Sequence, residues 1–204
     1  MLCFDNKNER IMDQQGGQLT LDHFTIENDQ IELKILQQKD AAELYAAIQA
    51  SLIELRKFPA SLIWSLQEPN LEASHAFCLS RMQALLNKEN FVYVVRDQDC
   101  KNFLGVMDIH EINWEKNSAA VGFWGNAQFK QQGYMCTALK LFAETLMNQW
   151  SFQRLEAFVD TENVLARKLC EKVDFKIIEI QQGKVQNPVD GSMRDICRYV
   201  LEKK

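Results

Sequence analysis

The loop "KQQGYMC", residues 130–136, stands where an alternating apolar pattern gives way to a helical one. A loop that leaves a strand and opens a helix directs several unpaired backbone N–H groups into one small volume, and the helix adds about half a positive charge at that end. This arrangement binds phosphate without any basic side chain. Gly133, the one glycine of the loop, permits close backbone approach. A plain connection between strand and helix is the alternative, and the loop alone does not decide between them.

The segments that precede this loop predict a hairpin and two helices. "LTLDHFTI" (19–26) and "IELKIL" (31–36) alternate at period two and are separated by "ENDQ", which is typical of a hairpin. Residues 39–58 have apolar residues at helical spacing, with Asp40 as the expected N-cap and Pro59 after the end. A second helix is expected over residues 71–87, with an apolar side formed by Ala73, Phe77, Met82 and Leu85.

The segments around and after the loop predict most of a sheet. Residues 91–97, 103–112 and 118–124 are short, rich in β-branched and aromatic residues, and joined by turn-like links, which indicates an antiparallel meander. A helix from about residue 135 to 150 follows, then a strand (154–160), a helix (163–173) and two strands (175–181 and 195–202). The crossover through the first of these helices should make strands 118–124 and 154–160 parallel.

Composition limits the class of protein. A chain of 204 residues is long enough for one domain that buries roughly 70% of its unfolded surface. We expect a flexible leader over residues 1–18 and a single domain over 19–204. The net charge of -5, without clustered Lys or Arg, argues against a nucleic-acid binder. No stretch approaches the roughly 20 apolar residues of a membrane span, so a cytoplasmic location is expected. The six cysteines and three histidines are scattered, which favours free thiols and predicts no metal site.

Two linked motifs resemble the acetyl-CoA signature of the GNAT superfamily of N-acetyltransferases. "VGFWGNAQFKQQGYMCTALKLF" is followed by "RLEAFVDTENVLARKLCEKVDF", and together they are similar to the RimJ/RimL-like branch, the ribosomal-protein N-acetyltransferases. The resemblance is strong over about residues 105–180 and extends back to about residue 31. It implies an α/β (α+β) GNAT fold: a mixed, mostly antiparallel, twisted sheet of about seven strands with a splayed parallel pair at its centre, flanked by about four helices.

The resemblance also implies how acetyl-CoA is held. The pyrophosphate should lie on backbone amides of the loop, the pantetheine arm should run beside the strand that precedes it, and Asn163 should bond the arm or simply cap its helix. The implied cofactor residues are Phe123, Trp124, Gly125, Lys130, Gln131, Gln132, Gly133, Tyr134, Met135, Cys136 and Asn163.

Departures from the family pattern predict local strain. Gln131 stands where glycine is common and must adopt a backbone angle that glycine accepts more easily. Asp174 replaces the glycine before Phe175, where the helix should close in a left-handed turn. Because the phosphate role depends on backbone N–H groups, side-chain changes in the loop need not remove it.

The catalytic positions follow the family pattern less closely. Ala120 stands where many relatives carry a glutamate base, so Glu156 is the remaining candidate base; a strand carboxylate paired with a neighbouring cation is the alternative. Counting seven residues from Asn163, as the family pattern implies for the proton donor, gives Cys170, for which helix packing is the alternative. Asp108, His110 and Glu111 lie on the preceding strand, near where the resemblance implies that the amine enters, and are candidates for the acceptor pocket.

The sequence therefore predicts an N-acetyltransferase that transfers acetyl directly from acetyl-CoA to a primary amine, in the first place a protein or peptide N-terminal α-amine. A small-molecule acceptor such as a polyamine, aminoglycoside or amino acid is one alternative. A GNAT-like module that binds acyl-CoA without turnover is another, because Ala120, Ala166 and Cys170 leave proton-handling positions blank or unusual. The expected partner is the amine acceptor, without nucleic acid or membrane, and a homodimer is left open.

Overall fold

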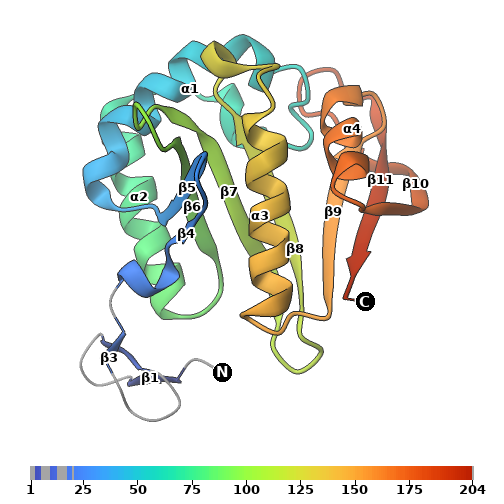
Figure 1. Cartoon of the computed structure of the whole chain (residues 1–204). Helices are drawn as coiled ribbons and strands as arrows, with labels where there is room; N and C mark the ends of the chain where they lie inside the picture. The colour runs from blue at the N-terminus through green and yellow to red at the C-terminus, as the bar shows by residue number, and fades with distance from the viewer. Residues whose placement is uncertain (1–2, 6–9, 13–17, 20, 204) are drawn as a thin grey trace.

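The fold, taken from a computed structural model, is described for residues 3–5, 10–12, 18–19 and 21–203. Its centre is one eight-stranded sheet with the order β10-β11-β9-β8-β7-β6-β5-β4 (Figure 1). The strands of this sheet are β4 (Ile26–Glu27), β5 (Ile31–Ile35), β6 (Phe91–Asp97), β7 (Phe103–Asn113), β8 (Ser118–Gly125), β9 (Arg154–Asp160), β10 (Lys176–Gln186) and β11 (Met193–Glu202). Three short strands, β1 (Cys3–Asp5), β2 (Arg10–Met12) and β3 (Gln18–Leu19), pair separately as a small antiparallel sheet.

Two helices pack on each face of the large sheet. α1 (Ala41–Leu55) and α2 (Leu71–Leu86) lie on one face, and α3 (Tyr134–Asn148) and α4 (Val164–Lys172) lie on the other, which faces the viewer in Figure 1. The predicted mixed α/β fold is therefore confirmed, with one strand more than the expected seven. No helix among the described residues is both long enough and apolar enough to cross a membrane.

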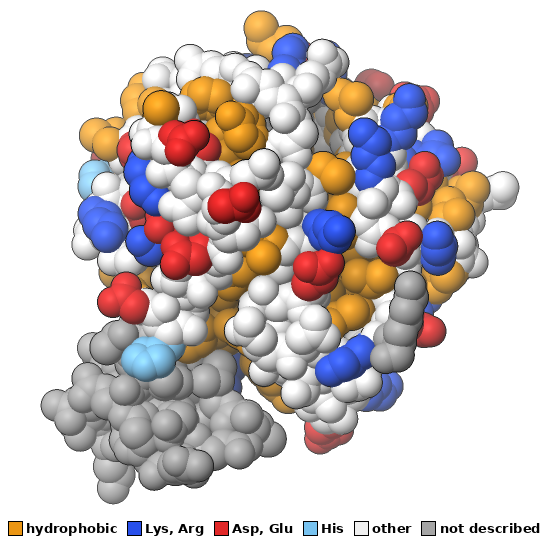
Figure 2. Space-filling model, in the orientation of Figure 1, with side chains coloured by type: hydrophobic (Ala, Val, Ile, Leu, Met, Phe, Trp, Pro, Cys, Tyr) orange, Lys and Arg blue, Asp and Glu red, His pale blue; other side chains and the backbone are white. Residues whose placement is uncertain are grey.

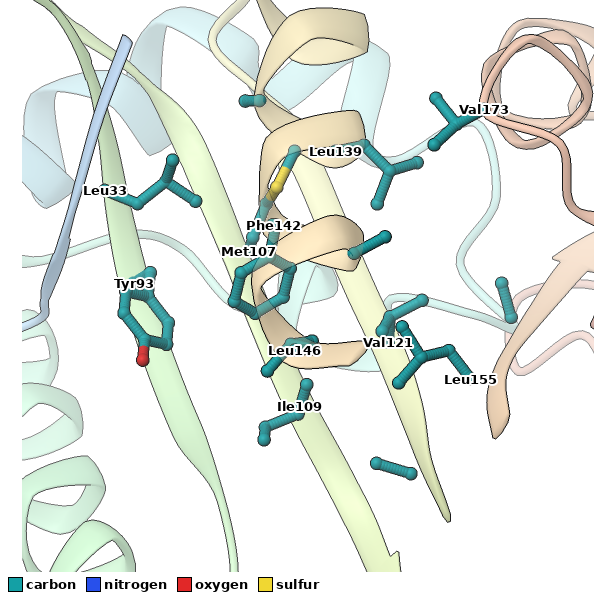
Figure 3. Close-up of a cluster of buried hydrophobic side chains, with 14 of the residues drawn as sticks. Leu33, Tyr93, Met107, Ile109, Val121, Leu139, Phe142, Leu146, Leu155 and Val173 are labelled. Carbon is teal, nitrogen blue, oxygen red and sulfur yellow. The ribbon is translucent and has the colours of Figure 1, made fainter. Parts of the chain in front are cut away.

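The larger core lies between the sheet and α3. Leu139, Phe142 and Leu146 recur along one face of α3 and are fully buried, and Figure 3 shows them directed at side chains of the central strands. The Tyr93 ring meets the Phe142 ring edge to face, with centroids 5.2 Å apart. A smaller core, which includes Leu44 of α1, fills the opposite face. Because both faces are covered, β6 is buried along nearly its whole length, and the central strands form a rigid base for the loops at their ends.

Among the described strands, β8 and β9 form the one parallel pair, as predicted, and they soon separate. They pair only where residues 118–120 lie beside residues 154–156. Beyond this point β8 pairs with β7 alone and β9 with β11 alone. The sheet therefore divides at its centre, and a V-shaped opening runs from Ala120 and Glu156 toward the carboxyl ends of both strands.

Three local predictions were wrong. The first hairpin strand is replaced over Leu21–Phe24 by a 3-10 helix, and only Ile26–Glu27 pairs with β5. Asp40 stands at the predicted N-cap position of α1 but makes no capping hydrogen bond: its carboxylate accepts the Gln37 N–H at 2.8 Å and pairs with Arg96 at 3.0 Å. In α2 the buried side is formed by Ser74, Cys78, Ala84 and Leu85, whereas Ala73 and Phe77 of the predicted apolar side are exposed.

The charged side chains of the α3/α4 face are interspersed. Figure 2 shows acidic and basic groups mixed over this face rather than gathered into a basic stripe. This distribution lacks the clustered positive charge that nucleic-acid backbones require. Most of the expected leader, residues 1–18, lies outside the described residues.

Candidate active site

The connection from β8 to α3 is anchored before it reaches the predicted phosphate loop. Asn126 is buried; its Oδ1 accepts the Gln128 N–H at 3.1 Å, and its Nδ2 donates to the Phe103 carbonyl at 2.9 Å. The Ser51 hydroxyl of α1 accepts the Ala127 N–H at 2.9 Å. These bonds fix the path of the chain through the 3-10 turn Ala127–Phe129, so the loop that follows has a defined starting direction.

The loop itself presents open backbone donors. Gln131 and Gly133 have positive φ angles of 64° and 86°, as predicted for Gln131. Of the described residues, none accepts a hydrogen bond from the N–H groups of residues 131–135; the first helical bonds run from Cys136 and Thr137 to the Gly133 carbonyl. A run of free N–H groups at the start of a fifteen-residue helix is an anion-binding arrangement.

The side chains of the loop point away from this group of donors or into solvent. Lys130 Nζ lies 3.3 Å from Glu54 of α1, so its charge is already paired. Met135 packs inward: a Cβ added to Gly125 would lie 3.1 Å from the Met135 Cγ. This contact places the start of α3 directly against the end of β8. A Cβ added to Gly133, by contrast, would meet nothing within 4 Å, so the outer side of the turn is open to a ligand.

A cavity of about 590 Å³ occupies the V between β8 and β9. Its walls include Phe123 from β8, Phe158 from β9, and Asn163 at the start of α4. The Asn163 Oδ1 accepts the Ala166 N–H at 3.1 Å, so this residue caps the helix while its amide nitrogen has no acceptor among the described residues. Neither the loop nor Trp124 and Gly125 lines this cavity, although the loop follows directly from the same strand.

A second cavity of about 540 Å³ lies between the sheet and helices α1 and α2. Its apolar wall contains Trp64, Phe77 and Trp124, and the two tryptophan rings lie 6.1 Å apart. Trp124 therefore faces this cavity and not the one in the V. The two cavities meet at shared lining residues, which are Ser61, Leu62, His110, Gly122 and Phe123. A donor in the V and an acceptor in the second cavity would come together at that junction.

Two of the predicted acceptor residues form a close pair at the junction. His110 Nδ1 lies 2.6 Å from Asp108 Oδ1. This hydrogen bond, aided by the charge of the carboxylate, raises the pKa of His110 above its ordinary value, against the opposing effect of burial. Asp108 lines the second cavity, and His110 lines both. Glu111, the third predicted residue, is exposed at an irregularity of β7, has a positive φ of 49°, and lines the cavity in the V.

Glu156, the candidate base, is held in an ion-paired cluster on β9. Arg198 donates to both of its carboxylate oxygens at 2.8 and 2.9 Å, and Arg154 donates to one of them at 2.7 Å. The hydrogen bond from Arg198, followed by that from Arg154, keeps the pKa of Glu156 below its ordinary value. Glu156 lines neither cavity. These contacts fit the ion-pair alternative better than a role in proton transfer.

Cys170, the candidate acid, is fully buried in the core on the α3/α4 face. Burial raises the pKa of its thiol to about 12, and the residue lines neither cavity. These surroundings fit the packing alternative. The described part of the chain contains no group of three or more His, Cys, Asp or Glu side chains placed to hold a metal.

Several residues of the site were not predicted from the sequence. Ser61 and Leu62 belong to the segment between α1 and α2, and Asn90 lies just before β6. Lys184 and Val185 reach the cavity in the V from β10, which extends farther than the pattern "FKIIEIQ" suggested. None of these residues belongs to a motif, because the sheet order, rather than sequence spacing, brings them to the junction.

A groove between splayed parallel strands, beside an open helix N-terminus, suits an extended ligand that carries phosphate. The family model for the acetyltransferase (GNAT) domain matches residues 30–176. Because this match spans most of the sequence, the chain belongs to the GNAT acetyltransferase family. It is an acetyltransferase with acetyl-CoA as its acetyl donor. A comparison with curated protein sequences finds no match.

Solved structures agree with this fold at low sequence identity. The microcin C7 self-immunity acetyltransferase MccE, in complex with acetyl-CoA and AMP, is 20% identical with a TM-score of 0.76 over 86% of this chain and 94% of its own. RimL, a ribosomal L7/L12 α-N-protein acetyltransferase in complex with coenzyme A, is 15% identical with a TM-score of 0.78, covering 87% and 97%. A ribosomal-protein-serine acetyltransferase structure from Vibrio cholerae is 18% identical with a TM-score of 0.71, covering 91% and 100%.

Proposed function

We propose that the chain transfers the acetyl group of acetyl-CoA to the α-amine of a protein or peptide N-terminus. The observation that carries this proposal is the meeting of two cavities at Gly122 and Phe123. The V between β8 and β9 takes the pantetheine arm and thioester, and the free N–H groups of residues 131–135 take the pyrophosphate. The amine enters through the second cavity and attacks the thioester directly, without a covalent enzyme intermediate.

The second cavity suits the end of a peptide. Asp108 contributes a carboxylate that attracts a cationic amine, and Trp64, Phe77 and Trp124 provide an apolar wall for the first side chains. An α-amine also needs little activation: at pH 7 its deprotonation costs about 1 kcal/mol, against roughly 4.6 kcal/mol for a lysine-like amine. The resemblance to ribosomal-protein acetyltransferases supports the same acceptor. We also propose that the reaction takes place in the cytoplasm.

A small-molecule amine is a second candidate acceptor. The observation in its favour is the second cavity, which at about 540 Å³ lies within the range that encloses a drug-sized ligand. The similar MccE structure was obtained with AMP as well as acetyl-CoA. The two candidates use the same donor site and differ only in what fills the second cavity.

A panel of amines tests the proposal. The protein is mixed with acetyl-CoA and, in turn, a serine-initiated peptide, an alanine-initiated peptide, an N-terminally blocked peptide with an internal lysine, spermidine and an aminoglycoside. Free thiol release is followed and products are identified by mass spectrometry. We expect acetylation of the free peptide N-termini. Acetylation of spermidine or the aminoglycoside alone would assign the chain to small-molecule amines, and coenzyme A binding without thiol release would exclude turnover of all these acceptors.

A further inference from the structure

Three polar side chains meet where the two cavities join. Asp108 and His110 lie two residues apart on β7 and therefore on the same face, and Asn90 lies just before β6 beside them. Asn90 Nδ2 lies 3.4 Å from Asp108 Oδ1. The Asp108 carboxylate lies directly over Gly122 of β8, where an added Cβ would come within 2.5 Å of its Oδ2. The cluster thus rests on the strand that borders both cavities.

Asn90 has an oxygen without a partner. Its side chain is buried, with 9% of the residue exposed, and its Nδ2 donates to the Ile109 carbonyl at 2.9 Å. Its Oδ1 accepts no hydrogen bond from the described residues and is itself covered, although Asn90 lines the second cavity, so a ligand reaches this oxygen only when the Asn90 side chain turns toward the cavity. A buried unsatisfied acceptor is costly, and native structures contain few. An oxygen of this kind beside a carboxylate is suited to a ligand that brings N–H donors.

The imidazole of His110 is oriented by its neighbour. The Asp108 carboxylate only accepts hydrogen bonds, so the nitrogen that faces it at 2.6 Å, Nδ1, carries the proton. In neutral His110 this leaves Nε2 as the acceptor. The side chain of His110 is 40% exposed and lines both cavities. A lone pair of fixed direction is therefore available at the junction.

We propose that Asn90 Oδ1 and Asp108 receive the N–H groups of the acceptor amine, and that His110 Nε2 takes its proton. This inference rests on the proposed acetyl transfer and names the residues that receive the amine. His110 takes the proton of the reacting nitrogen and is therefore the catalytic residue. Asp108 contacts the amine and also orients the imidazole of His110. Glu156 and Cys170, which the sequence suggested for proton transfer, have no part in this step.

The step balances without any further reactant. The neutral amine nitrogen attacks the thioester carbonyl carbon, the N–C bond forms, the C–S bond breaks, and coenzyme A leaves as its thiolate. The proton released from the nitrogen goes to Nε2 of His110. The resulting imidazolium gives this proton to the thiolate, which yields free coenzyme A and restores neutral His110.

The raised pKa of His110 suits an α-amine as the acceptor. An α-amine has an ordinary pKa of about 7.7 to 8.0, and the Asp108 carboxylate raises the pKa of His110 from its ordinary value in the direction of the amine's, which favours proton transfer from the amine. Protonated His110 cannot accept a proton and a protonated amine cannot attack, so kcat/KM should rise with pH through both pKa values and level off above the higher one. The carboxylates of Asp108 and Glu111 raise the pKa of His110. The other charged groups that line the two cavities are Glu68, Arg81, Asp160, Lys184 and Arg198.

Kinetics with alaninamide, a small α-amine, test the proposal. His110→Gln should lower kcat/KM for alaninamide about 100-fold and leave the KM for acetyl-CoA unchanged. Asp108→Asn should lower kcat/KM and move the acid limb of the pH profile to lower pH, because the pKa of His110 falls. His75→Gln and Asp99→Asn, both at exposed positions, are the matched controls. Wild-type kcat/KM and an unchanged pH profile in His110→Gln would overturn the proposal while acetyl transfer stands.

The role of Asn90 has its own variants. Asn90→Leu should raise the KM for alaninamide about tenfold, which corresponds to the loss of one good contact of about 1.4 kcal/mol. Asn90→Ala, which removes the same oxygen without adding bulk, should raise this KM by a similar factor and is the companion variant where Asn90→Leu fails to fold. An unchanged KM in a folded Asn90→Leu would remove Asn90 from the site.

An NMR titration decides the proposal if the wild type acetylates no amine, an outcome that would defeat the proposed function. The imidazole signals are assigned with His110→Gln and His75→Gln, and alaninamide is added in the presence of coenzyme A. We expect the His110 signals to respond to alaninamide and its pKa to fall in Asp108→Asn. No response to the amine, or an unchanged pKa in Asp108→Asn, would overturn the proposed cluster.

Discussion

At the residue scale, Glu156 illustrates how contacts decide the role of a carboxylate. Its two oxygens are occupied by Arg198 and Arg154, and its side chain is only 17% exposed. A base must have a free lone pair directed at its substrate, and here the guanidinium groups hold both oxygens. The cluster instead joins β9 to β11, because Glu156 and Arg198 belong to adjacent strands.

We predict that Glu156→Gln lowers stability and leaves catalysis largely intact. Loss of charge-assisted hydrogen bonds should cost about 1 to 2 kcal/mol of unfolding free energy at pH 7. Because the pKa of Glu156 is lowered in the fold, its contribution is present above the unfolded pKa and is lost as pH falls through the folded one. The difference from wild type should therefore shrink toward acidic pH in urea unfolding.

Glu202→Gln is the matched control for this variant. Glu202 pairs with the same Arg154 at 2.8 Å, but its side chain is 67% exposed, so its loss should change stability by under about 1 kcal/mol. A large fall in kcat for Glu156→Gln, with stability unchanged, would instead restore Glu156 as the base.

Asn163 caps α4, lines the cavity in the V, and has an amide nitrogen without an acceptor among the described residues. Asn163→Ala should cost about 1 kcal/mol of stability through the lost cap and also raise the KM for acetyl-CoA. Asn163→Asp keeps the oxygen that accepts from Ala166 but lacks the N–H donors. It should therefore keep the wild-type melting temperature and still raise the KM for acetyl-CoA several-fold. A normal KM in Asn163→Asp would limit this residue to capping.

At the element scale, the proposed phosphate loop, residues 130–136, depends on backbone geometry. Gly133 has a φ of 86° and open space around its missing side chain. An alanine there meets no atom, but it strains the left-handed turn by about 1 to 2 kcal/mol, and the free N–H groups shift with it. Side chains contribute little, because Lys130 is paired with Glu54 and Met135 is turned inward.

We predict that Gly133→Ala raises the KM for acetyl-CoA about tenfold, while the KM for acetyl-pantetheine, which lacks the pyrophosphate, stays at its wild-type value. Gly191→Ala is the matched control, since Gly191 also has a positive φ, of 74°, but lies in the turn between β10 and β11. An equal effect on both donors would show that the loop does not bind phosphate.

The elements that the sequence predicted well are those with local causes. The left-handed turn at Asp174 closes α4 through two bonds, from Asp174 to the Glu171 carbonyl and from Phe175 to the Cys170 carbonyl. The parallel pairing of β8 and β9 follows from the right-handed crossover through α3. Both depend on neighbours in the chain, so residue type and spacing are enough to predict them.

The features that could not be predicted depend on distant partners. Arg198, which donates to the Glu156 carboxylate, lies on the next strand, β11. Asn90, which lies 3.4 Å from Asp108 of β7, comes just before β6. The apolar side of α2 was misplaced because small residues, Ser74 and Cys78, pack inward. Phe77 instead borders the second cavity. Periodicity finds a helix, but it does not show which of two apolar faces meets the core and which meets a ligand.

At the scale of the whole molecule, the sheet consists of two parts joined across a narrow seam. β4 to β8 form one part and β9 to β11 the other. Strand pairing across the seam covers residues 118–120 and 154–156, and the Asn117 carbonyl accepts from the N–H groups of Gln153 and Arg154 beside it. Contacts between α3 and α4 add a second connection on one face. Beyond the seam, residues 121–125 and 157–160 have no strand beside them on the side of the V, so a bound donor would complete the sheet there.

We predict that coenzyme A slows hydrogen exchange along the V more than anywhere else in the sheet. Pantetheine amides that pair with β8 protect the exposed edge, and closing the V couples the two parts. At 100 times the dissociation constant, ligand binding can reduce exchange by up to about 100-fold, or 2.7 kcal/mol. Mass spectrometry should detect this in peptides that cover 121–125 and 157–160, with β6 residues 91–95, already buried between neighbours, as the internal control. Uniform protection across β6 and the V would mean that the donor stabilises the domain as a whole and does not bridge the seam. No protection in the V would place the pantetheine arm elsewhere.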